Sequence, residues 1–167
     1  MINKRSLELI AISLRNVIGI ESNVILNPTH LEELKTKISR YGCFEIIEAK
    51  SVDNVKVVFE NNKSIKIFLY GNHEKMFYDL VEMFTFAVLQ SQASKEENSE
   101  YYFPRMTKDQ GEADYLKLAF MMPKDEFLLR VIKYSSADSS IVNLLKMEKE
   151  VNKYCKKRGI DLEIWSA

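Results

Sequence analysis

The sequence is poor in residues that bind metal ions or form cross-links, with two cysteines and two histidines among 167 residues. Cys43 and Cys155 lie far apart and lack the CxxC spacing of metal and redox sites, so we expect two small buried side chains. His30 and His73 stand singly in predicted turns. Either could fold back as a metal ligand, but isolated histidines of this kind usually lie at the surface. Thiolate or imidazole clusters are therefore not expected.

The chain also lacks a long hydrophobic run and an excess of charge of either sign. Its apolar segments are short, and no N-terminal stretch has the features of a signal peptide or a membrane span. The 24 basic residues balance the 24 acidic ones, so no net field attracts nucleic acid or a membrane. A lysine-rich stretch at 146–158 contains Glu148 and Glu150, which favours a solvated helix face. We expect a soluble cytoplasmic protein without membrane contact or direct nucleic-acid binding.

The spacing of apolar residues predicts one α+β domain over residues 1–167, predominantly helical with a small three-stranded antiparallel sheet. Helical periodicity, capping boxes and Gly or Pro stops predict helices at 4–18, 29–41, 74–91, 107–122, 125–132 and 139–157. Alternating apolar residues predict strands at 43–49, 54–60 and 64–70. The polar stretch 92–106 is predicted to be a mobile loop, between an N-terminal part, 1–91, and a C-terminal helical part, 107–167.

The helix predicted at 74–91 has the frame of a zinc-peptidase helix without its two histidines. In an HExxH helix, two imidazoles four residues apart bind zinc, and the intervening Glu activates the zinc-bound water. Here Val81 and Thr85 occupy the ligand positions, and Glu82 occupies the position of the base. Valine has no lone pair and a neutral hydroxyl is a poor substitute for imidazole. Val81 also continues the apolar stripe of the helix, so we expect it in the core.

A second segment, residues 112–123, completes a resemblance to a known family. It starts with Glu112, Ala113 and Asp114 and ends with Met121, Met122 and Pro123. With the order of helices, small sheet and degenerate helix, it resembles the ImmA/IrrE family of metallopeptidases over roughly residues 5–160. The resemblance implies a zincin-like minimal core, and it places Glu112 near the third metal ligand. It also implies a partner, since family members cleave helix-turn-helix repressors of phages and mobile elements.

Three interpretations of function remain open. The first is a catalytically inactive pseudo-peptidase without a cofactor, which binds a repressor or related regulator of a phage or mobile element and acts as an anti-repressor. The second is a hydrolase with a displaced or non-zinc metal site built from Glu82, Glu112 and a histidine. The third is a regulatory subunit with an unrelated partner. Glu82 and Glu112 are also explained as a solvent-facing helix charge and a first-turn acid favoured by the helix dipole.

Aromatic residues beside the polar loop are the candidates for a partner-binding surface. They are Tyr101, Tyr102 and Phe103. Aromatic side chains anchor protein interfaces more often than other residues do.

Overall fold

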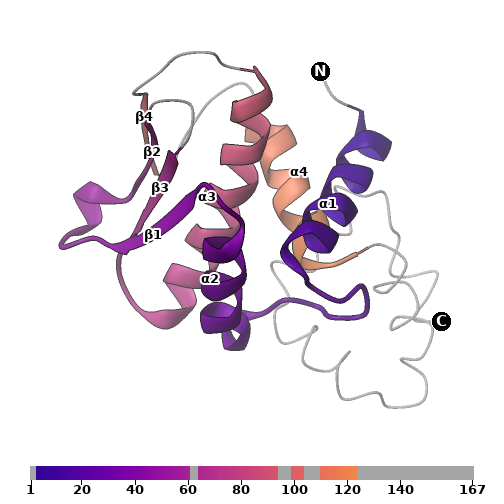
Figure 1. Ribbon diagram of the computed structural model, residues 1–167, viewed down its shortest axis with the longest axis horizontal. Coiled ribbons are helices and arrows are strands. Elements are labelled where there is room, and N and C mark those ends of the chain that lie inside the picture. The colour runs from indigo at the N-terminus through magenta and orange to yellow at the C-terminus, as the bar shows by residue number, and fades with distance from the viewer. Residues whose placement is uncertain (1–2, 61–63, 94–98, 104–109, 124–167) are drawn as a thin grey trace.

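A computed structural model describes residues 3–60, 64–93, 99–103 and 110–123, which contain four α-helices and one four-stranded sheet (Figure 1). The elements in chain order are α1 (Lys4–Ile18), the 3-10 turn η1 (Pro28–His30), α2 (Leu31–Arg40), β1 (Phe44–Glu48), the 3-10 turn η2 (Val52–Asn54), β2 (Lys56–Glu60), β3 (Ser64–Leu69), α3 (His73–Ala93), β4 (Glu100–Tyr102) and α4 (Gln110–Met121). The helices predicted at 125–132 and 139–157 lie outside the described residues.

The sheet corrects the predicted fold. It has four strands in the order β1-β3-β2-β4 and is mixed, so the prediction of a three-stranded antiparallel sheet was wrong. β2 pairs antiparallel with β3 as the short link suggested, but β1 pairs parallel with β3, and β4 pairs antiparallel with β2. Alternating apolar residues specify which face of a strand is buried, but they do not specify its neighbour or its direction. β4 has three residues inside the segment predicted as a loop, which is too short for a pattern.

The predicted first helix is confirmed because its ends are fixed by local contacts. The side chain of Asn3 accepts a hydrogen bond from the backbone amide of Ser6 at 2.8 Å, and Gly19 ends α1 with a φ of 80°. The start of the second helix differs from its prediction. The capping box is formed by Asn27 and His30 around η1, and α2 itself begins only at Leu31.

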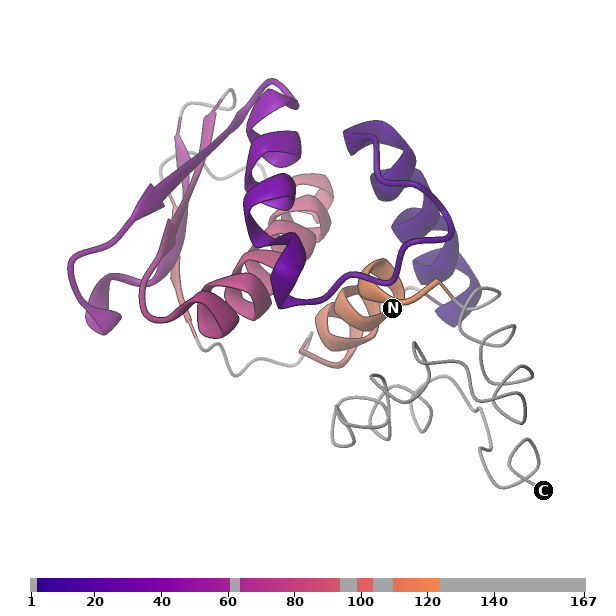
Figure 2. The same cartoon turned by 90° about the horizontal axis from the view of Figure 1, so that it is seen from below.

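Helix α3 forms the centre of the core. Figure 2 shows α2 and α3 against one face of the sheet, with α4 and α1 on the side of α3 that is away from the sheet. The Phe84 ring makes edge-on contacts with Phe44, the first residue of β1, and with Phe120 of α4, at centroid distances of 5.1 and 5.6 Å. One aromatic side chain therefore connects the sheet, α3 and α4, and it fixes the position of α4 relative to the degenerate motif on α3.

Candidate functional site on α3, α4 and β4

The two positions that would carry zinc ligands are both occupied by core side chains. Val81 and Thr85 have no exposed surface, which confirms the prediction that Val81 lies in the core. The Thr85 hydroxyl donates a hydrogen bond to the carbonyl oxygen of Val81 at 2.8 Å, one helical turn earlier. A threonine that bonds back to its own helix satisfies its buried hydroxyl locally. This hydroxyl is therefore engaged within α3.

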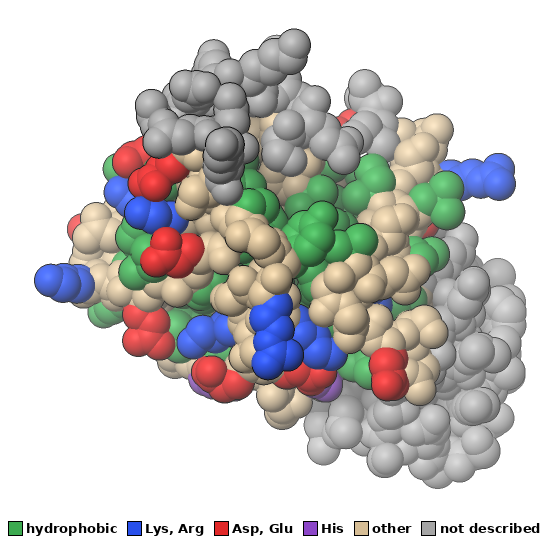
Figure 3. Space-filling model, in the orientation of Figure 1, with side chains coloured by type: hydrophobic (Ala, Val, Ile, Leu, Met, Phe, Trp, Pro, Cys, Tyr) green, Lys and Arg blue, Asp and Glu red, His purple; other side chains and the backbone are tan. Residues whose placement is uncertain are grey.

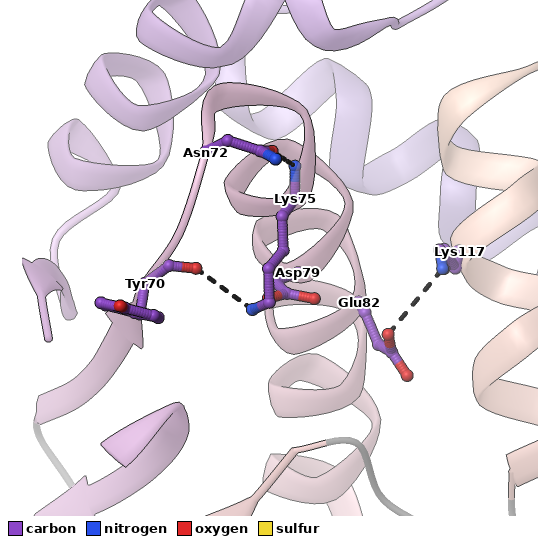
Figure 4. Close-up of polar contacts among 6 residues, drawn as sticks. All are labelled: Tyr70, Asn72, Lys75, Asp79, Glu82 and Lys117. Carbon is purple, nitrogen blue, oxygen red and sulfur yellow. Dashed lines mark hydrogen bonds and ion pairs between the residues drawn. The ribbon is translucent and has the colours of Figure 1, made fainter. Parts of the chain in front are cut away.

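Glu82 is held by a lysine from the next helix. The ammonium of Lys117 in α4 lies 3.8 Å from a carboxylate oxygen of Glu82 (Figure 4). It also lies 5.9 Å from the centre of the Tyr78 ring. The two charged side chains are 14% and 19% exposed, so most of this ion pair is screened from water. Glu82, at the position of the general base, is thus part of a polar link between α3 and α4. It is not the solvent-facing helix charge of the alternative interpretation.

Lys117 is the residue that sequence reasoning missed. Its neighbours Leu116 and Leu118 are both buried, and the described chain from Tyr115 to Met122 carries no other charged side chain. A single lysine inside an apolar helical run was the available signal, because a buried stretch retains a charge when a partner is present. The partner itself depends on how α4 packs against α3.

Glu112 lies in the first turn of α4 and is partly buried. This placement agrees with an acid favoured by the positive end of the helix dipole. Lys117 follows it further along the same helix, on the turn that reaches Glu82.

Both histidines are used in local structure around η1. The Nδ1 atom of His30 accepts a hydrogen bond from the backbone amide of Asn27 at 3.0 Å. The Nε2 atom of His73 lies 2.7 Å from the carbonyl oxygen of Pro28, so this ring joins the start of α3 to η1. Among the residues that the structure describes, no group of three or more His, Cys, Asp or Glu side chains is arranged to hold a metal ion.

Other polar side chains near the start of α3 stabilise that helix end. The side chain of Asn72 accepts a hydrogen bond from the amide of Lys75 at 2.8 Å, and Lys75 pairs with Asp79 and donates to the carbonyl oxygen of Tyr70 (Figure 4). Gly71 is required beside them, since its φ is 113° and an added Cβ would lie 2.8 Å from the Lys75 side chain. These residues cap and anchor α3.

The donor set of this region does not fit a zinc ion. Valine offers no donor, the Thr85 hydroxyl is bonded to its own helix, and Glu82 already faces an ammonium group. Zinc in proteins is bound by thiolate, imidazole and carboxylate groups in a nearly tetrahedral arrangement. The described part of α3 and α4 offers a paired carboxylate in place of that arrangement.

The three aromatic candidates at β4 have different environments. The Tyr101 ring packs edge-on against Phe59 and Phe86 at 5.7 and 5.1 Å, and its hydroxyl accepts a hydrogen bond from Gln90. Phe103 packs against Phe86 at 5.4 Å. Tyr102, by contrast, is 54% exposed. Tyr101 and Phe103 thus contribute to packing, and Tyr102 presents its ring to solvent.

Tyr102 belongs to a row of side chains that crosses all four strands. The strand register aligns Ile47, Phe68, Lys56 and Tyr102, which we call the open-face row. The Lys56 ammonium lies between two rings, 5.4 Å from the centre of Phe68 and 5.5 Å from that of Tyr102. Since successive side chains alternate between faces, this row lies opposite the buried Val57. In Figure 2 the described helices all lie on the other side of the sheet.

The surface carries charges of both signs. On the face drawn in Figure 3, acidic and basic side chains of the described residues are interspersed, and hydrophobic side chains lie between them. Within the same described residues, no helix combines the length and the apolar composition needed to cross a membrane.

Comparison of the chain with models of known protein families, with curated proteins and with solved structures finds no match. The geometry of α3, α4 and the open face of the sheet is therefore the structural basis for a proposal of function.

Proposed function

We propose that this protein acts by binding another protein and does not cleave it. The observation that carries the proposal is that all three positions of the degenerate motif are engaged within the fold: Val81 is buried, the Thr85 hydroxyl bonds to its own helix, and Glu82 pairs with Lys117. A carboxylate activates water for hydrolysis at this position only beside a metal-bound water. A binding function needs none of these groups to be free.

The partner that we propose is a helix-turn-helix repressor or a related regulator of a phage or mobile element. This choice rests on the resemblance of residues 112–123 and of the degenerate helix to the ImmA/IrrE family, and we propose a pseudo-peptidase of that kind. Such a protein alters the regulator by occupying its dimerisation or DNA-binding surface. Because a repressor works on DNA inside the cell, the proposed compartment is the cytoplasm.

The open-face row is the surface that we propose for partner contact. Tyr102 is its most exposed aromatic residue, and Ile47 and Phe68 extend the apolar surface toward the other edge of the sheet. Lys56 keeps an ammonium group among these rings and lies 3.5 Å from Glu100. A surface that combines aromatic rings with a paired charge offers both apolar contact and hydrogen bonding, as protein interfaces do.

A repressor-controlled reporter tests the proposal. The natural chain and Glu82→Ala should change expression from the repressed promoter to the same extent, and the repressor should stay full-length on a blot in both cases. Glu33→Ala is the matched control, because it also removes a carboxylate that pairs with a lysine, at 2.9 Å from Lys37. A repressor fragment that appears with the natural chain and disappears with Glu82→Ala would instead establish a hydrolase with a displaced metal site.

A further inference from the structure

The ion pair between α3 and α4 lies on a defined face of α3. Tyr78 precedes both Val81 and Glu82 by three or four positions, and Thr85 follows both by four or three, so each of these pairs lies on neighbouring turns of the helix. Lys117 contacts two of these residues. Its ammonium lies 3.8 Å from the Glu82 carboxylate (Figure 4) and 5.9 Å from the centre of the Tyr78 ring, which the figure does not draw. The positive charge from α4 therefore lies beside Glu82, which occupies the position of the general base between the two ligand positions.

The surroundings of Glu82 explain why a positive charge is needed there. Four fifths of its side chain is screened from water, with an exposed fraction of 19%, and Val81 next to it is fully buried. An ionised carboxylate that loses much of its hydration is costly unless a counter-charge or hydrogen bonds replace the water. In a metal-dependent site, the ion supplies most of the local positive charge. Here an ammonium group supplies it.

We propose that the ammonium of Lys117 takes the place of a divalent cation beside Glu82. It holds this carboxylate between α3 and α4, and it keeps metal ions out of the junction by charge repulsion. The inference rests on the proposed function, in which this face of α3 has lost its metal. It adds that a particular residue, Lys117, compensates for the loss. The absence of histidines at positions 81 and 85 is then not the only feature that prevents metal binding here.

A purely structural role for Lys117 makes a different prediction. If the side chain only joined the two helices, its removal would change stability without changing the affinity of this face for metal ions. A charge that repels a divalent cation across a few ångströms raises the dissociation constant by more than an order of magnitude at protein-like dielectric values. Metal affinity therefore separates the two roles.

The experiment uses the full chain with Val81→His and Thr85→His, which together supply two imidazoles on the face beside Lys117. Zinc affinity is measured at neutral pH by competition with a chromophoric chelator, first with Lys117 retained and then with Lys117→Met added. We expect Lys117→Met to lower the zinc dissociation constant by about tenfold or more. Lys117→Arg should leave it nearly unchanged, because the positive charge remains.

A second lysine provides the matched control. Lys37 on α2 likewise pairs with a glutamate, Glu33 at 2.9 Å, so Lys37→Met removes the same charge from another part of the molecule. It should not tighten zinc binding. Equal zinc affinity with and without the Lys117 ammonium, including no binding in either case, would overturn the inference. Zinc bound by the natural chain would instead contradict the proposed function.

A mutant cycle in the natural background covers the case in which the histidine variants do not fold. Urea unfolding is measured for Lys117→Met, Glu82→Gln and the combination. We expect Lys117→Met to lower the unfolding midpoint strongly when Glu82 is present and only slightly when residue 82 is glutamine, because the carboxylate that faces this ammonium is then absent. Additive effects would show that Lys117 does not serve Glu82, and the inference would fail.

Discussion

The guanidinium of Arg15 in α1 donates a hydrogen bond of 2.7 Å to the carbonyl oxygen of Phe120 in α4. It also donates to the carbonyl oxygens of Glu21, at 2.6 Å, and Val24, although Arg15 is only 2% exposed. Burial lowers the pKa of this guanidinium from its ordinary value to about 10, because desolvation disfavours the charged form. Arg15 thus attaches the end of α4, the helix that carries Lys117, to α1 and to the segment after it.

Arg15→Met should destabilise the protein by about 2–4 kcal/mol. The substitution keeps an apolar stem of similar length but leaves three carbonyl oxygens without their charged donor, and unsatisfied buried groups are costly. Urea unfolding followed by circular dichroism measures the effect. Arg40→Met is the matched control, since Arg40 is exposed in the last turn of α2 and its loss should cost little. Equal unfolding midpoints for the two variants would contradict the role of Arg15.

The difference in stability between the natural chain and Arg15→Met should stay constant from about pH 6 to pH 9. The pKa of Arg15 is lower in the folded chain than in the unfolded chain, so the cost of burying its charge is fully present below about pH 10. It is relieved only as the pH rises above that value, where the folded state binds fewer protons. A difference that changed steeply near neutral pH would show that another titrating group is linked to Arg15.

The purified protein should carry no stoichiometric zinc. The two ligand positions are a buried valine and a threonine bonded to its own helix, and neither offers the donor that zinc requires. Elemental analysis of protein prepared without chelator checks this expectation. About one zinc ion per chain would contradict the interpretation as a pseudo-peptidase.

Local signals made the helices predictable. The predicted range 4–18 equals α1, because Asn3 and Gly19 fix its ends through contacts with their own neighbours. The helix predicted at 74–91 is found as α3, His73–Ala93, and Asn72 fixes its start by accepting a hydrogen bond from the Lys75 amide. The order of the strands was not predictable, because β3 pairs with both β1 and β2 through contacts that no single strand pattern contains.

The candidate site likewise has features that the sequence predicts and features that depend on how the elements pack. The burial of Val81 follows from the apolar stripe of α3 and was predicted. The pairing of Glu82 with Lys117 was not, because it depends on the packing of α4 against α3 around Phe84 and Phe120. Tyr101 and Tyr102 are adjacent and equally aromatic, so their opposite exposure became visible only with the register of β4.

Val81→His combined with Thr85→His should lower the melting temperature in the absence of metal. Both positions are fully buried, and an imidazole placed there without a hydrogen-bond partner costs roughly 1–3 kcal/mol. Thermal unfolding in the presence of a chelator measures the change. Ser13→His, at an exposed position of α1, controls for the substitution itself. An unchanged melting temperature would mean that this face of α3 is open to water.

Tyr101→Ala and Tyr102→Ala should separate stability from binding. Tyr101 packs against Phe59 and Phe86, so its loss should cost about 2–4 kcal/mol of stability. Tyr102 is 54% exposed and contacts Lys56 and Glu100, so its loss should cost less than about 1 kcal/mol. If the open-face row binds the partner, Tyr102→Ala should nevertheless weaken binding by about tenfold, as truncation of an aromatic anchor does. Thermal unfolding gives the first quantity, and pull-down of the partner from the native host with each purified variant gives the second. Full retention of the partner by a stably folded Tyr102→Ala variant would exclude this ring as an anchor.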